Sequence, residues 1–348
     1  MFLNTELFGH QRGASNKGYK KIKYGTMVLS TQNLHLGNAN VNQRFTHGMV
    51  SPAYKTYNIT GCSVCLIAQW IKSEAAKRFF YNATTVGASV CRRNVEWETL
   101  YEQPLYLPCI EEQEEIAKFL TLLSDRINKQ QQFVSSLKKY KRGVMQKVFR
   151  KMSAFSPSGF ETVRLSDIFK KVSRRNSNGE IKNVITNSAE HGLIPQRDFF
   201  DKDIAVDGNT GNYYVIEHGD FVYNPRKSNT APYGPFNRYE RQEKGIISPL
   251  YTCLVLNADI EPSYLAWYFK SDAWYRYIYD NGSQGVRHDR VSMTDDLLMG
   301  IPVIIPSKDS QIKIAKLLDS LEKRFQVELS RFENLKTVRE ALLQQLFI

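Results

Sequence analysis

Polar and basic side chains are grouped in two segments of the chain where they could contact nucleic-acid bases. Arginine can form a pair of hydrogen bonds with guanine, and asparagine can do so with adenine. The first segment follows an apolar, strand-like run and consists of Arg226, Lys227, Ser228 and Asn229. The second follows a glycine-rich turn and contributes Arg287, His288 and Arg290, which suit contacts to phosphates or bases. We interpret these residues as a candidate DNA-binding surface.

Smaller versions of both segments occur earlier in the chain. Gln32 and Asn33 end a short polar run, and Arg92 and Arg93 form a basic pair. The alternative for any one of these residues is an ordinary solvated surface position. A further aromatic group has helical spacing, which favours a role in the core; it comprises Trp267, Tyr268, Trp274, Tyr275 and Tyr277.

Catalytic motifs are incomplete. An adenine methyltransferase would need Asn-Pro-Pro and an aromatic residue, but the pair Asn224-Pro225 is followed by Arg226. A nuclease of the PD-(D/E)xK type would need Pro-Asp before a triplet such as Glu180-Ile181-Lys182, and no such pair precedes it. We therefore predict no catalytic residues and a chain that is not itself an enzyme.

The cysteines favour reduced thiols over a metal site. There are five, an odd number with no regular spacing. Cys62 and Cys65 form a lone CxxC pair, and only Cys91 and His47 are available to complete the four ligands of a structural zinc site. We predict buried, unreactive thiols and no bound metal.

The charge balance indicates a polyanionic partner. The 348 residues carry a net charge of +12, and the isoelectric point is near 9.3. A basic surface with many tyrosines is typical of proteins that bind the phosphate backbone of DNA. Part of the clustering has another cause, because residues 111–150 begin acidic and end basic, which complements a helix dipole. The sequence has no long apolar run and no signal segment, which predicts a soluble, cytoplasmic protein without a membrane partner.

One segment of the chain occurs twice. Residues 108–149 align without gaps with residues 306–347, at a constant offset of 198. Apolar residues recur in steps of four and three in both copies, which predicts two long helices that pair as a coiled coil. The first copy has this seam at Ile116, Leu120, Leu123, Ile127, Val134, Leu137, Val144 and Val148, and the second at Ile314, Leu318, Leu321, Phe325, Phe332, Leu335, Leu342 and Leu346. Polar residues interrupt both seams at matching places, Gln130/Glu328 and Lys141/Arg339, which predicts that the two helices pack on each other in one register.

A more diverged repeat precedes each helix. Gly48-Met49-Val50-Ser51-Pro52 matches Gly245-Ile246-Ile247-Ser248-Pro249. We therefore predict four parts: a first globular unit in residues 1–107, a spacer helix in 108–151, a second globular unit in 152–305 and another spacer helix in 306–348. The second unit opens with residues 163–169, for which we find no counterpart in the first. The first unit is thus expected to be shortened at its N-terminus, through truncation, recombination or a start codon further upstream.

Alternating apolar residues and turn signals predict mixed α+β units. In the second unit, residues 213–216, 220–223, 250–256 and 302–306 resemble strands, and residues 262–280 resemble an aromatic-rich helix. The first unit offers the same elements in the same order, at residues 27–29, 63–68, 73–81 and 105–107. Overall we expect two mixed α/β domains separated by two long antiparallel helices, with an internal pseudo-two-fold repeat.

The twofold order of these segments resembles a known family. A short strand ending in proline, a glutamine before Ile-Ala-Lys and a long amphipathic helix ending in Gln-x-x-Phe are similar to the conserved regions of DNA specificity subunits of type I restriction–modification systems. Residues 282–287 and 219–225 are similar to parts of that family's target recognition domains. The resemblance extends from about residue 25 to the end of the chain.

The resemblance implies a division of labour. Each target recognition domain would read one half of a split double-stranded DNA site, and the helix pair would act as a spacer. The helices would also dock two copies of an adenine-N6 methyltransferase subunit, and a restriction subunit would join them. S-adenosylmethionine, ATP and Mg²⁺ are then expected on these partners, with no cofactor bound by the chain itself. The alternative is a truncated subunit or recombination cassette that reads one half-site or needs dimerisation.

Overall fold

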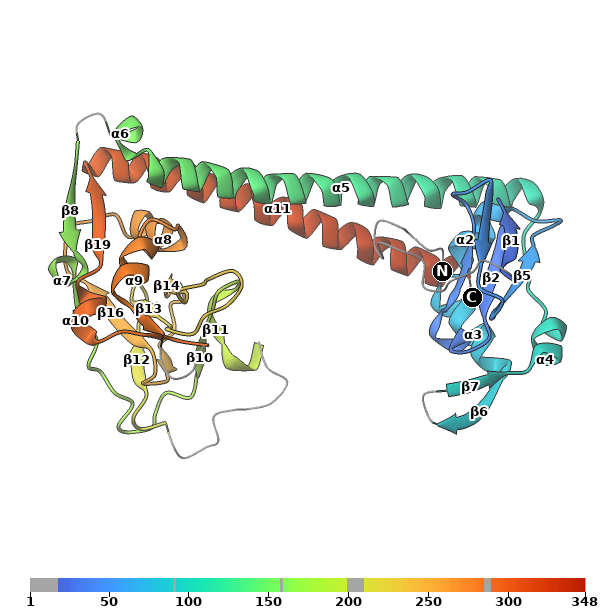
Figure 1. The fold of residues 1–348 in the computed structure, drawn as a ribbon, viewed down its shortest axis with the longest axis horizontal. Coiled ribbons are helices and arrows are strands. Elements are labelled where there is room, and N and C mark those ends of the chain that lie inside the picture. Colours follow the sequence, from blue (N-terminus) through green and yellow to red (C-terminus); the bar gives the residue numbers. More distant parts are fainter. Residues whose placement is uncertain (1–17, 90–91, 157–158, 199–209, 285–288, 348) are drawn as a thin grey trace. The chain divides into compact units, whose positions relative to one another are not determined.

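The computed structural model describes residues 18–89, 92–156, 159–198, 210–284 and 289–347 (Figure 1). The chain divides into two compact units. Unit 1 consists of residues 1–135 and 327–348, and unit 2 consists of residues 136–326. Each unit therefore contains one globular part and a stretch of both long helices, α5 (Ile110–Arg150) and α11 (Lys308–Leu346).

The predicted helix pairing is confirmed, and it is antiparallel. In unit 1, Gln130 Nε2 donates to Glu328 Oε2 at 2.8 Å, and Arg339 Nε donates to Ser124 Oγ at 3.2 Å. Residues with higher numbers on α11 therefore contact residues with lower numbers on α5. The two helices thus run in opposite directions. In unit 2 the corresponding contact is the ion pair between Lys141 and Glu322. Polar seam residues of this kind fix the register of a helix pair.

These polar contacts repeat with the sequence. Gln130 meets Glu328, its own counterpart at the offset of 198. Lys141 and Glu322 are the counterparts of Arg339 and Ser124, so the same contact forms once in each unit with different side chains. The seam prediction was wrong at one position, because Leu346 is 40% exposed and Leu343 is buried instead.

Unit 2 is built around an antiparallel sheet of order β14-β13-β16-β9. Its strands are β9 (Phe169–Lys171), β13 (Phe221–Tyr223), β14 (Phe236–Arg238) and β16 (Thr252–Leu256). The remaining strands form pairs: β8 (Phe160–Arg164) with β19 (Pro302–Pro306), β10 (Ile185–Ser188) with β11 (Gly192–Pro195), β12 (Tyr214–Ile216) with β15 (Gly245–Ile247), and β17 (Ser283–Gln284) with β18 (Val291–Ser292). The helices are α6 (Met152–Phe155), α7 (Leu165–Ile168), α8 (Pro262–Lys270), α9 (Tyr275–Asn281) and α10 (Asp295–Met299), with a 3-10 turn η2 (Gln196–Asp198).

Aromatic side chains fill the core of unit 2. Helix α8 packs on the sheet, where Phe269 stacks on Phe236 with ring centroids 4.0 Å apart. Trp274 and Tyr268 are also almost fully buried, which confirms the core role expected from their helical spacing. The region predicted as one helix, residues 262–280, is instead α8 and α9, because Ser271 ends the first helix in an extended conformation.

Unit 1 has a smaller version of this architecture. Its sheet has the order β3-β2-β5, formed by β2 (Thr26–Ser30), β3 (Ala39–Val41) and β5 (Tyr54–Asn58). Strand β1 (Lys20–Lys23) pairs with β4 (His47–Val50), and β6 (Thr84–Ser89) with β7 (Arg92–Val95). The helices are η1 (Leu34–Leu36), α2 (Val64–Trp70), α3 (Glu74–Asn82) and α4 (Trp97–Glu102).

Strand register shows that the two globular parts are equivalent. Met27 pairs with both Val41 and Tyr57, just as Phe221 pairs with both Arg238 and Leu254. On this basis β2, β3 and β5 of unit 1 correspond to β13, β14 and β16 of unit 2. Residues 63–68, which the sequence placed among the strands, lie in α2, because the Ser63 hydroxyl accepts from Leu66 N and begins a helix. Residues 105–107 belong to no strand.

A glutamine attaches each long helix to its own globular part. Gln113 Nε2 donates to Pro108 O at 2.9 Å, and its Oε1 accepts from Ser63 N at 2.8 Å. Gln311 makes the equivalent pair of bonds with Pro306 O and Glu261 N, both at 2.8 Å. Both glutamines are buried, so losing either side chain would leave buried backbone groups unpaired. None of the helices in the described ranges is long and apolar enough to span a membrane.

Candidate nucleic-acid interface

The two polar segments of unit 2 lie side by side. Residues 224–235 connect β13 to β14, and they carry Arg226 through Asn229. Arg226 forms an antiparallel bridge with Arg290, and Lys227 N donates to Asp289 O at 2.8 Å. Val291 N closes the pairing by donating to Pro225 O at 2.9 Å. Residues more than sixty positions apart in sequence are therefore brought into one surface, while Arg287 and His288 lie outside the described residues.

The basic groups on this surface are largely available to a ligand. Arg226 is 68% exposed, and its nearest carboxylate, Asp289, is 3.7 Å away and half exposed, so this ion pair is weak. Ser228 and Asn229 are exposed at the tip of the loop. Within the described part of the chain, the buried Nε of Arg290 has no hydrogen-bond partner. Ser228 Oγ accepts from Ala231 N at 3.1 Å within the loop, so the side chains of Arg226 and Asn229 are the exposed polar groups that the loop offers to a ligand.

A buried asparagine network supports this loop from below. Asn187, on β10, donates to Val222 O at 2.8 Å. Asn237 donates to Asn187 Oδ1 at 2.7 Å, and Asn224 donates to Asn187 O at 3.1 Å. Asn224 Oδ1 in turn accepts from Arg226 N at 2.9 Å. All three side chains are buried, so the network ties the β10–β11 hairpin rigidly to the base of the loop.

Backbone geometry closes the same loop. Gly234 has φ +85°, and a Cβ there would lie 1.9 Å from Asn224 O. Tyr223 adds a second constraint, since its hydroxyl donates to Tyr233 O at 2.8 Å. Burial raises the pKa of this phenol, which therefore remains a donor. Asn187, Asn237 and Gly234 were missed in the sequence analysis; the turn signal at Gly234 was the only local indication.

The loop borders a polar groove of about 560 Å³. Its walls are residues 186–190 on one side and residues 226–230 on the other. A larger cavity of about 790 Å³ in the same unit is lined by Glu190, Glu240 and Glu322 and by seven basic residues of α5, β14, α8 and the segment after β14. The basic residues are Lys138, Lys139, Lys141, Arg142, Arg238, Arg241 and Lys270. Thr230 and Glu190 line both spaces, so the polar groove and the basic cavity adjoin.

Unit 1 repeats the pairing of loop and late strand. Gln32 bridges to Asn94 of β7, much as Arg226 bridges to Arg290 in unit 2, although the strand register makes Asn94 the counterpart of Ser292, two residues after Arg290. Asn33 has a left-handed backbone, φ 59°, which asparagine tolerates better than most residues. Arg92 lies in β7 next to Arg93. The predicted loop and the predicted basic pair are therefore neighbours here as well.

Arg93 is already engaged within unit 1. Its Nε donates to Thr84 Oγ1 at 2.7 Å, its terminal nitrogen donates to Thr84 O at 2.8 Å, and its guanidinium lies 4.2 Å from the centre of the Tyr81 ring. This residue thus has a structural role that its sequence position did not reveal. Its role in DNA binding stays a prediction, as does that of every other residue in the candidate set.

The rejected catalytic and metal motifs have ordinary structural positions. Glu180 and Lys182 lie in a loop that Asn176 holds through bonds to both backbone groups of Ile181, not on a strand. Cys62 and Cys65 are free thiols but are only partly buried, so the prediction that they are buried was wrong. Cys91 lies outside the described residues. Among the described side chains, no group of three potential ligands is arranged to hold a metal ion.

Solved structures share this fold. No protein-family model matches the chain. The HsdS subunit from Thermoanaerobacter tengcongensis matches with a TM-score of 0.52 at 16% identity, over 96% of this chain and 83% of that one. The type I restriction-modification system S subunit from M. genitalium matches with a TM-score of 0.51 at 14% identity, over 97% and 87%. A chain from a structure of complex assembly in the type I R-M system gives 0.59 at 15% identity, over 96% and 84%.

Proposed function

We propose that this chain is the DNA-binding specificity subunit of a type I restriction–modification complex and that it reads a bipartite site. One observation carries the proposal: in each unit, the polar loop after the central strand bridges to an arginine-bearing segment near the end of the globular part, β7 in unit 1 and Arg290 in unit 2. The same arrangement is thus built twice, with different side chains, on a fold shared with S subunits. Polar loops that differ in sequence, carried on equivalent scaffolds, suit the recognition of two different half-sites.

Unit 2 has the chemistry to read one half-site. Arg226 and Asn229 are exposed on a rigidly supported loop, where they suit guanine and adenine edges. Lys138, Lys139 and Arg142 of the adjoining basic cavity are exposed and suit contacts to the phosphate backbone, which position a protein without reading sequence. Base-reading and backbone-binding groups are therefore adjacent, as direct readout requires.

The long helices fit a spacer role. Helix α5 has 41 residues, which corresponds to about 60 Å at 1.5 Å per residue. Successive major-groove faces on one side of a DNA duplex recur every ~34–36 Å. A helix of this length is longer than one turn of DNA, as a spacer between two reading domains requires.

We propose that α5 also docks the partner that performs the chemistry, an adenine-N6 methyltransferase subunit, with a restriction subunit completing the complex. In unit 1 this helix exposes three large apolar side chains: Phe119 (51%), Leu122 (61%) and Phe133 (40%). They lie outside the seam, and their spacing places them on one helical stripe. Exposed stripes of this kind mark helix-binding surfaces. The chain itself is then non-catalytic, and S-adenosylmethionine, ATP and Mg²⁺ belong to the partners.

Changing the stripe should separate assembly from folding. The double variant Phe119→Asp/Leu122→Asp is expected to weaken binding of the methyltransferase subunit roughly tenfold or more, because two apolar anchors are lost at an interface. Thermal stability of the isolated chain should be unchanged, since both side chains are exposed. Asn128→Asp/Gln132→Asp adds the same charge on another face of α5 and serves as the control. Equal binding by both variants would exclude this stripe as the docking surface.

The proposed function is tested by methylome sequencing of the host with and without the gene. We expect a bipartite adenine-methylation motif to disappear on deletion. Loss of only one half-motif would support the alternative, a subunit that reads through one unit. An unchanged methylome, with the partner genes expressed, would rule out the proposal.

A further inference from the structure

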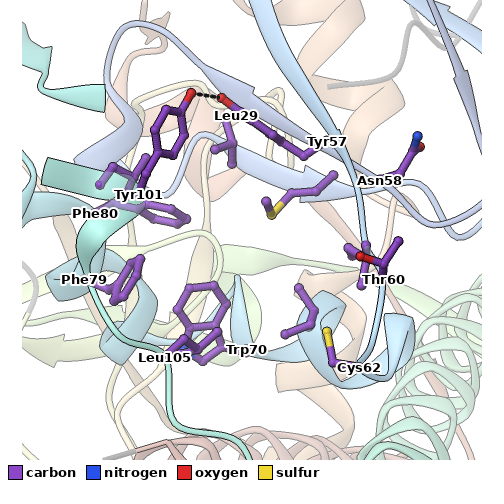
Figure 2. A pocket seen from close by; sticks show the side chains of 14 residues that line it. Leu29, Tyr57, Asn58, Thr60, Cys62, Trp70, Phe79, Phe80, Tyr101 and Leu105 are labelled. Carbon is purple, nitrogen blue, oxygen red and sulfur yellow. Dashed lines mark hydrogen bonds between the residues drawn. The ribbon is translucent and has the colours of Figure 1, made fainter. Parts of the chain in front are cut away.

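An apolar cavity of about 340 Å³ opens into unit 1 beside its sheet (Figure 2). It is lined by Met27 and Leu29 of β2, Tyr57 of β5, and the aromatic rings of Trp70 and Phe80 from the two helices. Figure 2 shows Tyr57 and Tyr101 joined at one edge, where their hydroxyls are 2.6 Å apart. Leu105, also in the lining, is 38% exposed. A concave apolar surface of this size is large enough to accommodate apolar side chains from another segment.

The equivalent place in unit 2 is filled. There Leu165 and Ile168 of α7 and Phe169 of β9 are buried in the core. Phe169 packs on Phe221, the counterpart of Met27, with ring centroids 5.0 Å apart. The counterpart of Leu105 is Val303, which is 0% exposed because β19 pairs with β8. The segment β8-α7-β9 thus covers, in unit 2, the surface that forms the cavity wall in unit 1.

The edges of unit 1 show the same difference. Strand β16 of unit 2 pairs on its outer side with β9, joining Leu256 to Phe169. Its counterpart β5 pairs with β2 alone within the described ranges, and residues 104–108, the counterpart of β19, lie in no strand there. An open strand edge beside an apolar cavity is suited to accept one more extended segment.

We infer that this cavity is a docking site for the chain's own N-terminal residues Thr5, Glu6, Leu7 and Phe8. No segment of unit 1 matches residues 163–171 over their full length, but these four residues match Ser166-Asp167-Ile168-Phe169 in sequence. Asp167 accepts from Arg164 N at 2.8 Å, a role that Glu6 can repeat. Ile168 and Phe169 are the apolar residues that enter the unit 2 core, and Leu7 and Phe8 supply the same chemistry.

The register of unit 2 makes the docking specific. The Phe169–Leu256 pairing, transferred to unit 1, places Phe8 beside Ile59 at the end of β5. From Phe8 to Lys20, where β1 begins, the chain has twelve residues, which can span up to about 40 Å. The connection is therefore long enough for intramolecular docking, in which Leu7 and Phe8 would be removed from water.

Photo-crosslinking tests the occupant in the full chain without DNA or partners. With benzoylphenylalanine in place of Phe8, we expect intramolecular crosslinks to the cavity lining, among them Ile59 and Trp70. The same group in place of His10 is the matched control and should give fewer of these products. Crosslinks to a second copy of the chain, or to residues outside the lining, would overturn the inference.

Alkylation of Cys62 provides a second readout. This thiol lines the cavity, and burial raises its pKa above the ordinary value. The variant Leu7→Ala/Phe8→Ala should accelerate modification of Cys62 by roughly tenfold, equivalent to ~1.4 kcal/mol of lost docking free energy. The exposed Cys109 should react at an unchanged rate in the same sample. An unaltered Cys62 rate would contradict docking, whatever the outcome for DNA recognition.

Discussion

Replacing Arg226 with alanine is expected to weaken specific DNA binding about tenfold to a hundredfold, and Arg226→Ala/Arg290→Ala more strongly. A bidentate contact between arginine and a base is worth ~1–3 kcal/mol, and its loss also relaxes specificity at that base pair. The two arginines are neighbours through their backbone bridge, so both side chains belong to one contact surface. Affinity should be measured by fluorescence anisotropy at several salt concentrations, and site choice by mapping methylated adenines.

The control for this experiment is Arg276→Ala. Arg276 carries the same charge in the same unit and is 84% exposed, but it lies on α9 and pairs with Asp280. Its loss should leave the methylated sequence unchanged and reduce affinity slightly at most. If Arg226→Ala bound the same site with the same affinity as the control, Arg226 would be removed from the candidate interface.

Gly234→Ala should disrupt the β13–β14 loop of unit 2, the candidate DNA-binding loop. A side chain at φ +85° costs roughly 1–2 kcal/mol. The close approach of the new Cβ to Asn224 O forces a further backbone shift, typically worth about 1–3 kcal/mol. Since Asn224 also holds Arg226, the substitution is expected to lower both the free energy of unfolding of unit 2 and the affinity for DNA. Chemical denaturation and DNA titration would measure the two effects.

Gly219→Ala is the control that separates the cost of the left-handed backbone from the cost of the steric clash with Asn224. Gly219 has φ +93°, so it carries a similar conformational penalty, but a Cβ there meets no atom within 4 Å. We expect it to lose only the conformational part of the stability and to keep its DNA affinity. Equal losses in the two variants would mean that the contact with Asn224 does not control the loop.

The two units support their loops by different means. In unit 2, Asn187 on the β10–β11 hairpin fixes the loop from below. The described residues of unit 1 include no equivalent hairpin, and the contacts of Arg93 with Thr84 and Tyr81 hold the late strand instead. The two units thus share one scaffold but stabilise their polar loops through different contacts. This difference is consistent with two half-sites of different sequence.

The sequence alone was sufficient for the helices, their pairing and the repeat. Apolar residues that recur in steps of four and three over about forty residues predict a helix with one apolar stripe. Two helices whose stripes are interrupted by polar residues at matching positions are expected to pair with each other. Gln130 and Glu328 meet as that pattern required. The strands at residues 220–223 and 302–306 were also predictable, because alternation and bounding turns are local signals.

Tertiary structure decided the composition of the site. The proximity of Arg226 to Arg290, the support from Asn187 and the internal engagement of Arg93 all depend on contacts between residues distant in sequence. Such contacts produce no repeating pattern in the sequence, since each one joins a single polar residue of one segment to a single residue of another. Residues 63–68 show the same limit at the level of secondary structure: a short apolar run fits a strand or a helix equally well, and here the Ser63 cap and packing in the core favour the helix.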